Sequence, residues 1–194
     1  MPRPGGESQA GRDAGEVTRL LVALREGDAT AAARLVELLY DDLRRLARRQ
    51  LGGPRGTLGP TAVVHEAYLK LFDRSEVAAR DRAHFLAIAS RAMRQVVVDY
   101  ARTRSRQKRG GGVAAVPIED AEPAVTEEVE RVLGVDRALE RLRRDDPRLV
   151  DVVECRFFGG LSEPETAEAL GLSLRSVQRL WHEARERLRA DLAR

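Results

Sequence analysis

The sequence predicts an all-α fold, arranged as two small helical domains joined by a flexible linker. Apolar residues recur at the spacing of amphipathic helices through most of the chain, and no segment shows the sustained apolar–polar alternation of a strand. Helix boundaries are marked by Ser, Thr or Asp at the starts of these segments and by Gly or Pro at their ends. A polar, Gly-rich stretch interrupts the pattern past the middle of the chain, which favours two domains over one.

Composition narrows the class of protein. A chain of 194 residues with 34% charged and only 4% aromatic residues must build its cores from Leu, Val and Ala. The net charge of +3 is modest, but the basic residues are clustered, which is typical of nucleic-acid binding. The single cysteine, Cys155, lies in an apolar stretch and is expected to be buried. Without a secretory or membrane-spanning segment, we expect a cytoplasmic protein with no membrane insertion.

Helix-capping and helix-breaking residues predict the first three elements of the chain. Residues 1–15 are rich in Gly and Pro, and we expect a disordered tail there. Residues 17–24 form a short amphipathic helix that Gly27 ends. Asp28 then caps a second helix that continues to Gly52, with these leucines facing inward: Leu35, Leu38, Leu39, Leu43 and Leu46.

Two further helices complete the first domain, which spans residues 16–106. Thr61 can cap the third helix, whose inward stripe is Val64, Ala67, Tyr68 and Leu71. The fourth starts near His84 and ends in a run of basic residues before three glycines. Its inward positions are Phe85, Ile88, Ala89, Ala92, Val96 and Tyr100.

A linker is predicted over residues 107–126, where glycines and then acidic residues leave little to bury. Helical spacing resumes in the second domain, residues 127–194. Asp146 and Pro147 are an N-cap and a first helical residue, and they open a helix that the sequence predicts to be buried through Val150, Val153 and Phe157.

Residues 161–188 carry the signature of a helix-turn-helix. Ser162 and Glu165 are spaced as a capping box, and Pro164 fits the first turn of the helix that they open. Gly171 stands where a helix end favours a left-handed residue, and Ser173 can cap the second helix. The inward stripe of that second helix is Val177, Trp181, Ala184 and Leu188.

The other face of this second helix carries hydrogen-bond donors that can reach phosphates and base edges, as a recognition helix does in a major groove. They are Arg175, Ser176, Gln178, Arg179, His182 and Arg185. An ordinary helical hairpin with a solvated basic face is the alternative. The short Gly turn, the double capping and the crowding of donors favour DNA binding.

The sequence offers no catalytic site, metal site or cofactor site. His65-Glu66 lacks the second His that a zinc protease would place four residues on, where Leu69 stands. Lys108 precedes the glycines, whereas a phosphate-binding P-loop needs a lysine after them. We therefore expect a protein that is not an enzyme.

Taken together, the order of elements resembles a bacterial RNA polymerase sigma factor, of the extracytoplasmic-function (ECF) group of the sigma-70 superfamily. The resemblance covers about residues 16–194. Three stretches carry it, in the expected order: Pro60 to Leu69 (PTAVVHEAYL), Arg82 to Arg102 (RAHFLAIASRAMRQVVVDYAR) and Arg156 to Ser162 (RFFGGLS).

This resemblance implies that residues 16–106 are sigma region 2 and residues 127–194 are sigma region 4. The partners that it implies are promoter DNA and core RNA polymerase, through the clamp helices of the largest subunit and the flap. Region 2 would dock on the clamp helices through Thr61 to Phe72, which makes His65, Glu66 and Lys70 the candidate contacts. Many relatives have Gln where this chain has His65. A merely solvated face is the alternative.

The resemblance also implies two DNA surfaces. The fourth helix would recognise the minus-ten element and help to melt it through Arg91, Arg94, Gln95, Asp99, Arg102 and Arg104. The loop at residues 75–84 would capture a flipped base, and it lacks aromatics, so we expect a polar pocket. The basic run from Arg102 to Arg109 would be the track for the melted strand. A solvated helix end whose positive charges complement the helix dipole is the alternative, and it accounts for one or two arginines of this run better than for all of them. The helix-turn-helix would recognise the minus-thirty-five element.

The predicted function is therefore that of an ECF sigma factor, which binds core polymerase and directs promoter recognition and transcription initiation. The resemblance also makes an anti-sigma protein a plausible partner. A stand-alone helix-turn-helix regulator is the alternative, but it would need an α/β receiver or ligand-binding domain, and the first half is predicted to be helical. An enzyme acting on nucleic acid would need a metal or nucleophile constellation, which the sequence does not offer.

Overall fold

The structure, a computed structural model, describes residues 9–52, 58–72, 78–108 and 123–193. All regular elements within these ranges are helices, which confirms the predicted all-α class. The first half contains α1 (Gln9–Arg25), α2 (Ala29–Leu38), α3 (Tyr40–Leu51), α4 (Pro60–Phe72) and α5 (Arg82–Lys108). The second contains α6 (Pro123–Asp145), α7 (Pro147–Val153), a π-helical turn η1 (Glu154–Phe158), α8 (Glu163–Leu170) and α9 (Leu174–Leu192).

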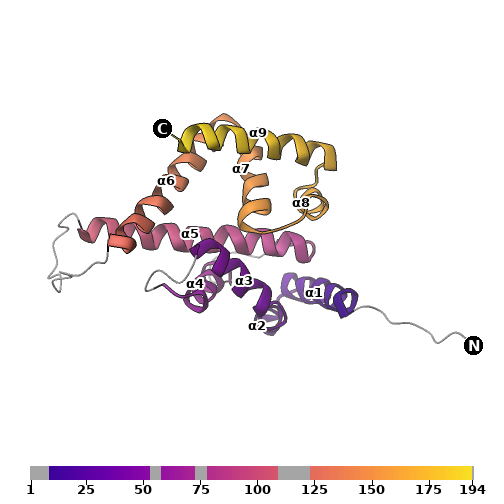
Figure 1. Cartoon of the computed structure of the whole chain (residues 1–194). Coiled ribbons are helices and arrows are strands. Elements are labelled where there is room, and N and C mark those ends of the chain that lie inside the picture. Colours follow the sequence, from indigo (N-terminus) through magenta and orange to yellow (C-terminus); the bar gives the residue numbers. More distant parts are fainter. Residues whose placement is uncertain (1–8, 53–57, 73–77, 109–122, 194) are drawn as a thin grey trace, which may run out of the picture.

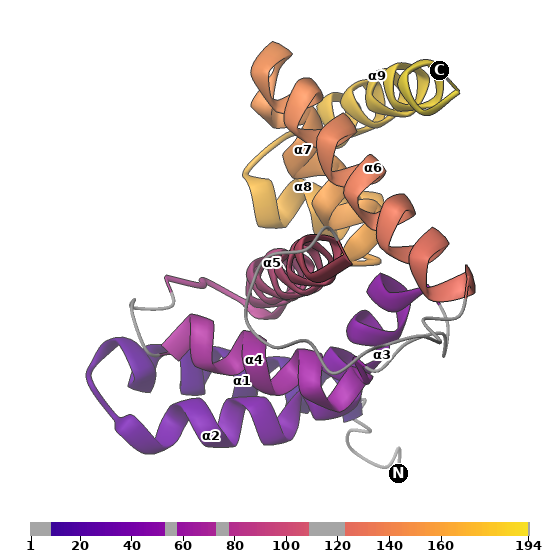
Figure 2. The ribbon, with the colours of Figure 1, turned by 90° about the vertical axis from the view of Figure 1, so that its left-hand side faces the viewer.

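Helix α5 is the central element of the fold. Figure 1 shows α1 to α4 on one side of it and α6 to α9 on the other, and Figure 2 shows α5 nearly end-on between the two groups. Asp81 caps α5, because its Oδ1 accepts a hydrogen bond from the backbone N–H of His84 over 2.8 Å. A helix of 27 residues therefore offers one face to each half of the chain.

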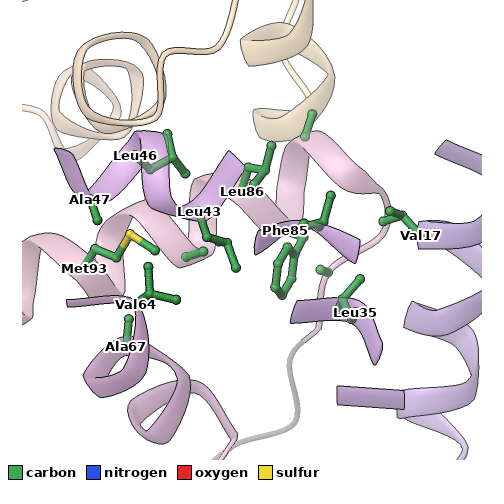
Figure 3. Packing of buried hydrophobic residues seen from close by; sticks show 14 of the residues in the cluster. Val17, Leu35, Leu43, Leu46, Ala47, Val64, Ala67, Phe85, Leu86 and Met93 are labelled. Atoms are coloured by element: carbon green, nitrogen blue, oxygen red, sulfur yellow. The ribbon is translucent and has the colours of Figure 1, made fainter. Parts of the chain in front are cut away.

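The core of the first half lies between α5 and the helices below it in Figure 1. Phe85 and Met93 of α5 are almost fully buried, and they pack among Leu43 of α3 and Val64 and Ala67 of α4 (Figure 3). Apart from Met93, which the helical spacing did not place in the interior, these are predicted inward positions. Burying a side chain such as Phe85 contributes roughly 1.5 to 3 kcal/mol.

Helices α2 and α3 correct the sequence prediction of one helix from Asp28 to Gly52. The chain breaks at Leu39, which has φ −101° and ψ 9°. Leu35, Leu39 and Leu43 are buried before, at and after the break, so both helices face the core. The break lets α2 pack on α1 while α3 packs on α4 and α5.

Two other boundaries differ from the expected ones by a few residues. Helix α1 begins at Gln9, inside the segment 1–15 that the sequence predicts to be a tail, and residues 1–8 lie outside the described part of the chain. Helix α4 begins at Pro60, where the Gly59 carbonyl accepts from Val63 N–H over 3.1 Å, one residue before the predicted Thr61 cap.

The second half has a core of its own around Leu139, Leu149, Val150 and Leu180. Helix α7 starts as predicted: Asp146 accepts a hydrogen bond from Arg148 N–H and Pro147 opens the helix. These residues join α6, α7 and α9 into one bundle.

The predicted burial of Phe157 is wrong. Phe157 is 58% exposed, whereas Phe158 is 9% exposed and belongs to the core. The cause is η1, since a π-helical turn holds more residues than an α-helical turn and moves the inward position one residue along the chain.

The halves also share apolar contacts. Cys155, Leu161 and Ala169 from the second half are buried in the hydrophobic cluster of the first. Of the predicted linker, residues 109–122 lie outside the described residues, while α5 includes 107–108 and α6 includes 123–126. The division into two domains stays a prediction.

Candidate nucleic-acid interface

The helix-turn-helix is built from α8, a short turn and α9. Ser162 N–H donates to Glu165 Oε2 over 2.8 Å, and Glu165 N–H donates to Ser162 Oγ over 3.3 Å. This reciprocal pair is the predicted capping box. Gly171 ends α8 with φ +64°, the left-handed conformation that glycine adopts without strain. Ser173 Oγ accepts from Ser176 N–H over 3.1 Å and caps α9.

One side of α9 fixes the helix against the second core. Val177, Leu180 and Ala184 are buried there. Trp181 is half-buried against the same core, with the guanidinium carbons of Arg156 and Arg185 at 5.6 and 5.8 Å from its ring centroid. Its predicted role as a core residue is thus compatible with its position, and the two cations cover the part that the core leaves open.

The opposite side of α9 presents the predicted donors to solvent. Arg175, Gln178, Arg179, His182 and Arg185 are exposed, and Ser176 is half-buried. Two of these side chains have acidic neighbours that lie near the surface: Gln178 Nε2 donates to Glu163 Oε2 over 3.0 Å, and Arg179 Nη1 lies 3.7 Å from Glu183 Oε2. Such exposed pairs are weak and can give way to a nucleic acid.

The predicted minus-ten residues on α5 have a different environment. Three of them, which we call the α5 arginines, form ion pairs with the second half of the chain: Arg91, Arg94 and Arg102. Their partners, which we call the acidic cluster, come from α6, α7 and η1: Asp136, Asp151 and Glu154.

Arg91 holds two members of the acidic cluster. Its Nη2 lies 2.7 Å from Asp151 Oδ1 and its Nε lies 2.5 Å from Glu154 Oε2. Burial works against the charge of Arg91, but the carboxylates of Glu154 and Asp151 outweigh it and raise the pKa of the guanidinium. Arg91 therefore stays fully charged at the contact between the halves.

Arg94 and Arg102 share the Asp136 carboxylate. Arg94 Nη1 lies 2.8 Å from Asp136 Oδ1, and Arg102 Nη2 lies 2.8 Å from Asp136 Oδ2. Arg94 also lies 3.4 Å from Glu154 Oε1 and is only 8% exposed. In this arrangement Arg94 faces the second half of the chain and not solvent, contrary to the expected DNA-facing position.

The remaining predicted α5 residues lie nearer to α4. Asp99 Oδ1 accepts from Gln95 Nε2 over 2.8 Å, and Asp99 Oδ2 lies 2.6 Å from Lys70 Nζ. Partial burial tends to raise the pKa of Asp99, but the hydrogen bonds from Lys70 and Gln95 outweigh it and lower the pKa. Arg104 Nε donates to the Tyr100 hydroxyl over 3.1 Å. The Lys70–Asp99 pair thus links a predicted polymerase residue to the predicted DNA helix.

The predicted polymerase contacts lie on one exposed face of α4. His65, Glu66 and Lys70 are exposed, together with Leu69, which is 44% exposed. Beside them an open, largely apolar groove of about 370 Å³ runs between α2, the start of α3 and α4. Its lining includes Ala33, Val36, Tyr40, Thr61, His65 and Tyr68.

Sequence reasoning missed the acidic cluster and the apolar part of the α4 surface. Glu154 gave one signal that could have revealed this cluster, since it is flanked by the apolar residues Val152 and Val153 on one side and Cys155 on the other. A charge at such a position predicts a buried partner. Tyr40 and Leu69 offered no comparable signal.

Part of the predicted base-capturing loop, residues 75–77, lies outside the described residues. The last residues of this loop form hydrogen bonds with the start of α5. Besides the Asp81 cap, His84 Nδ1 accepts a hydrogen bond from Arg80 N–H over 3.3 Å. Burial and the nearby Arg80 charge lower the pKa of His84.

Within the described ranges, no group of three or more His, Cys, Asp or Glu side chains is placed to hold a metal ion. Nor does any helix there have the length and apolar character needed to cross a membrane.

The capped pair α8 and α9 and the central helix α5 define the class of an all-helical protein with a helix-turn-helix in its second half. The model of the ECF sigma factor family matches residues 14–194. The chain therefore belongs to the ECF sigma factor family and acts as a sigma factor in transcription initiation. Sigma factors are in general not enzymes.

No curated protein matches the chain. One solved structure to which it is similar is described as CnrH in complex with the cytosolic domain of CnrY. The identity is 22%, the match covers 92% of this chain and 97% of that one, and the TM-score is 0.42.

Proposed function

We propose that this sigma factor recognises a promoter through two separate surfaces and binds core RNA polymerase through a third. The exposed face of α9 binds the minus-thirty-five element, and α5 binds the minus-ten element and helps to melt it. The exposed face of α4 binds the clamp helices of the largest polymerase subunit. The second half of the chain makes a further contact with the polymerase flap. Polymerase supplies the catalysis, and the chain has no catalytic role of its own.

The geometry of α9 is the observation that carries the proposal. The helix begins at a capped N-terminus, is held by Val177, Leu180 and Ala184, and projects Arg175, Arg179 and His182 into solvent. The positive end of the helix dipole and these donors favour the entry of this end into a major groove. Arginine and glutamine side chains can then form paired hydrogen bonds with base edges.

The surface of α4 supports the polymerase contact. His65, Glu66 and Lys70 offer charge and hydrogen bonds, while the adjoining groove offers apolar area that Tyr40 and Tyr68 line. Polar groups beside an apolar groove suit the docking of a helical partner. Because His65 lines the groove and lies on the exposed face, it is the central residue of the proposed contact.

The decisive experiment is reconstitution with core polymerase. The purified chain should co-elute with bacterial core RNA polymerase on size exclusion, and the complex should give discrete run-off transcripts from fragmented genomic DNA of the same source. His65→Ala should weaken the co-elution, while Glu37→Ala, which lines the groove from α2 and not from α4, should change it less. Elution of the chain alone, together with specific binding to a duplex, would favour a stand-alone regulator.

The proposal includes an anti-sigma protein as a further partner and the cytoplasm as the location, where polymerase and promoters meet. An anti-sigma protein must compete with polymerase for the sigma factor. Affinity capture of the tagged chain from cells, with and without added core polymerase, tests this: a partner that polymerase displaces supports it, and recovery of polymerase subunits alone contradicts it.

A further inference from the structure

The side chain of Gln178 on α9 is tied to α8 by a hydrogen bond. Helix α8 lies beside the N-terminal end of α9 (Figure 1), and Gln178 Nε2 donates to Glu163 Oε2 over 3.0 Å. Because a carboxylate can only accept, the amide of Gln178 must turn its nitrogen toward Glu163 and its carbonyl oxygen away. Glu163 therefore determines which end of this amide faces out from α8.

Glu163 is itself held in place by Arg156. Arg156 Nη2 lies 3.7 Å from Glu163 Oε1, and the two side chains are only 23% and 30% exposed. Arg156 is anchored in turn, because its Nη1 donates to the Leu161 carbonyl over 2.5 Å and its guanidinium carbon lies 5.6 Å from the ring centroid of Trp181. The orientation of the Gln178 amide is thus set within the second half of the chain before DNA binds, which lowers the cost of ordering it on binding.

An amide with a fixed orientation distinguishes the two purines. In the major groove adenine presents the N7 acceptor beside the N6 amino donor, whereas guanine presents two acceptors, N7 and O6. With one N–H directed to Glu163, Gln178 keeps a second N–H and its carbonyl oxygen, and these complement N7 and the amino group of adenine. The same carbonyl oxygen would oppose O6 of guanine, and turning the amide over would set that oxygen against the Glu163 carboxylate.

Leu174 lies one helical turn before Gln178, on the same side of α9. It is 44% exposed, and neither hydrophobic cluster of the described residues includes it. As the first residue of α9 it projects toward the helix N-terminus, the end that is proposed to enter the major groove. Thymine alone among the four bases presents a methyl group there, so an apolar side chain at this position favours thymine.

We propose that the α8 side of the recognition helix is specific for A·T base pairs in the upstream element. Gln178 binds adenine, Leu174 contacts a thymine methyl group, and Glu163 is the positioning residue of Gln178. This inference rests on the proposed role of α9 and names the base pairs that this side of the helix recognises. Arg179 carries donors only and suits guanine, so its contact is separate from the one proposed for Gln178.

The test uses the full chain bound to core polymerase and a pool of DNA duplexes with a randomised upstream segment and a premelted start site. The premelted bubble removes the need for a minus-ten element, so enrichment reports the upstream contact. The bound duplexes should share a motif that contains A·T pairs, and the same selection with Gln178→Ala should lose the preference for adenine at one position. Guanine in place of adenine at that position should weaken binding of the unaltered chain by about tenfold.

Glu163→Gln tests the positioning role, because glutamine has the same shape but can also donate. The Gln178 amide is then free to turn over, and the preference for adenine over guanine should fall to about twofold or less. Glu168→Gln, an exposed carboxylate on the same helix, is the matched control and should leave the preference unchanged. A purely structural role of Glu163 would weaken binding to both duplexes and preserve their ratio.

Deoxyuridine in place of each thymine of the motif in turn tests Leu174, because it removes only the methyl group. One such replacement should weaken binding by about three- to fourfold, and Leu174→Ala should abolish that difference. Leu192→Ala is the control, since Leu192 is 52% exposed at the other end of α9, and it should preserve the difference. Each readout compares two duplexes for one variant, so a change in the amount of folded protein cancels.

The outcomes separate this inference from the proposed function. A motif that changes with Arg179→Ala but at no position with Gln178→Ala or Leu174→Ala would overturn the inference and leave the upstream role of α9 intact. An undiminished preference for adenine in Glu163→Gln would overturn the positioning role. If no motif is enriched at all, the upstream role of α9 is wrong and the inference is overturned with it.

Discussion

Arg94 Nη1 lies 2.8 Å from Asp136 Oδ1, and the two residues, from different halves of the chain, are 8% and 6% exposed. Pairing at this depth ties the basic face of α5 to the second half energetically, because neither charge can lose the other and remain buried at low cost. Arg94, which the sequence predicts to bind DNA, is therefore also part of the contact between the two halves.

We expect Arg94→Ala to lower the free energy of unfolding by about 3 to 5 kcal/mol, because it leaves Asp136 and Glu154 buried with fewer cations. Urea denaturation followed by circular dichroism measures this. Arg141→Ala is the control: Arg141 pairs with Asp191 at the surface, 48% exposed, and its loss should cost no more than about 1 kcal/mol. Equal losses in the two variants would contradict the coupling.

The register of η1 predicts opposite roles for two adjacent phenylalanines. Phe158→Ala should cost about 3 to 5 kcal/mol of stability because it empties a buried site, whereas Phe157→Ala should cost less than about 1 kcal/mol, since Phe157 is 58% exposed. Thermal unfolding of the two variants checks this. A larger loss for Phe157 would restore the register that the sequence predicts.

The parts of the site that the sequence predicted depend on local interactions. The capping box of Ser162 and Glu165, the left-handed Gly171 and the Ser173 cap each involve residues within four positions of one another. Their types and spacing are sufficient to predict such contacts. The exposed donors of α9 follow from the helical spacing of its apolar residues, because the core buries the apolar face and leaves the opposite face to solvent.

The parts that the sequence missed depend on contacts between distant residues. The break at Leu39 lets α2 pack on α1 while α3 packs on α4 and α5, and the exposure of Phe157 follows from a π-helical turn that no residue type signals. Arg94 and Asp136 are 42 residues apart, so periodicity alone could not show that they meet. Sequence reasoning placed Arg94 on a polar face without showing what that face contacts.

The capping box should make the stability of the second half depend on pH. The hydrogen bonds from the Ser162 side chain and backbone lower the pKa of Glu165 below its ordinary value of 4.5. The folded state therefore binds the proton less readily than the unfolded state, and the stabilisation is present above pH 4.5 and is lost as the pH falls through the lowered pKa. Glu165→Gln should reduce stability at pH 7 and flatten this acid dependence in thermal unfolding, whereas Glu168→Gln, on the same helix, should not.

Substitutions at two glycines can distinguish the cost of backbone strain from the cost of a clash with a distant side chain. Gly160 and Gly171 both have φ +64°, and alanine at either should cost about 1 to 2 kcal/mol. A Cβ at Gly160 would in addition lie 1.7 Å from Arg49 Nη1, whereas Gly171 has no such neighbour within 4 Å. Gly160→Ala should therefore cost more in urea denaturation, and the excess should vanish in an Arg49→Ala background. An excess that persists there would show that another group meets the new methyl.

Arg179 and Arg189 should differ in what they contribute to promoter choice. Both side chains are exposed, at 63% and 66%, but Arg179 lies in the N-terminal half of α9 and Arg189 near its end. Arg179→Ala should cost roughly 1 to 3 kcal/mol of discrimination between a matched and a scrambled upstream element, because a base contact is lost. Arg189→Ala should weaken transcription from both equally, because a phosphate contact is sequence-independent. Run-off transcription with core polymerase on the paired templates measures both ratios, and equal losses on the two templates for Arg179→Ala would mean that Arg179 meets only the DNA backbone.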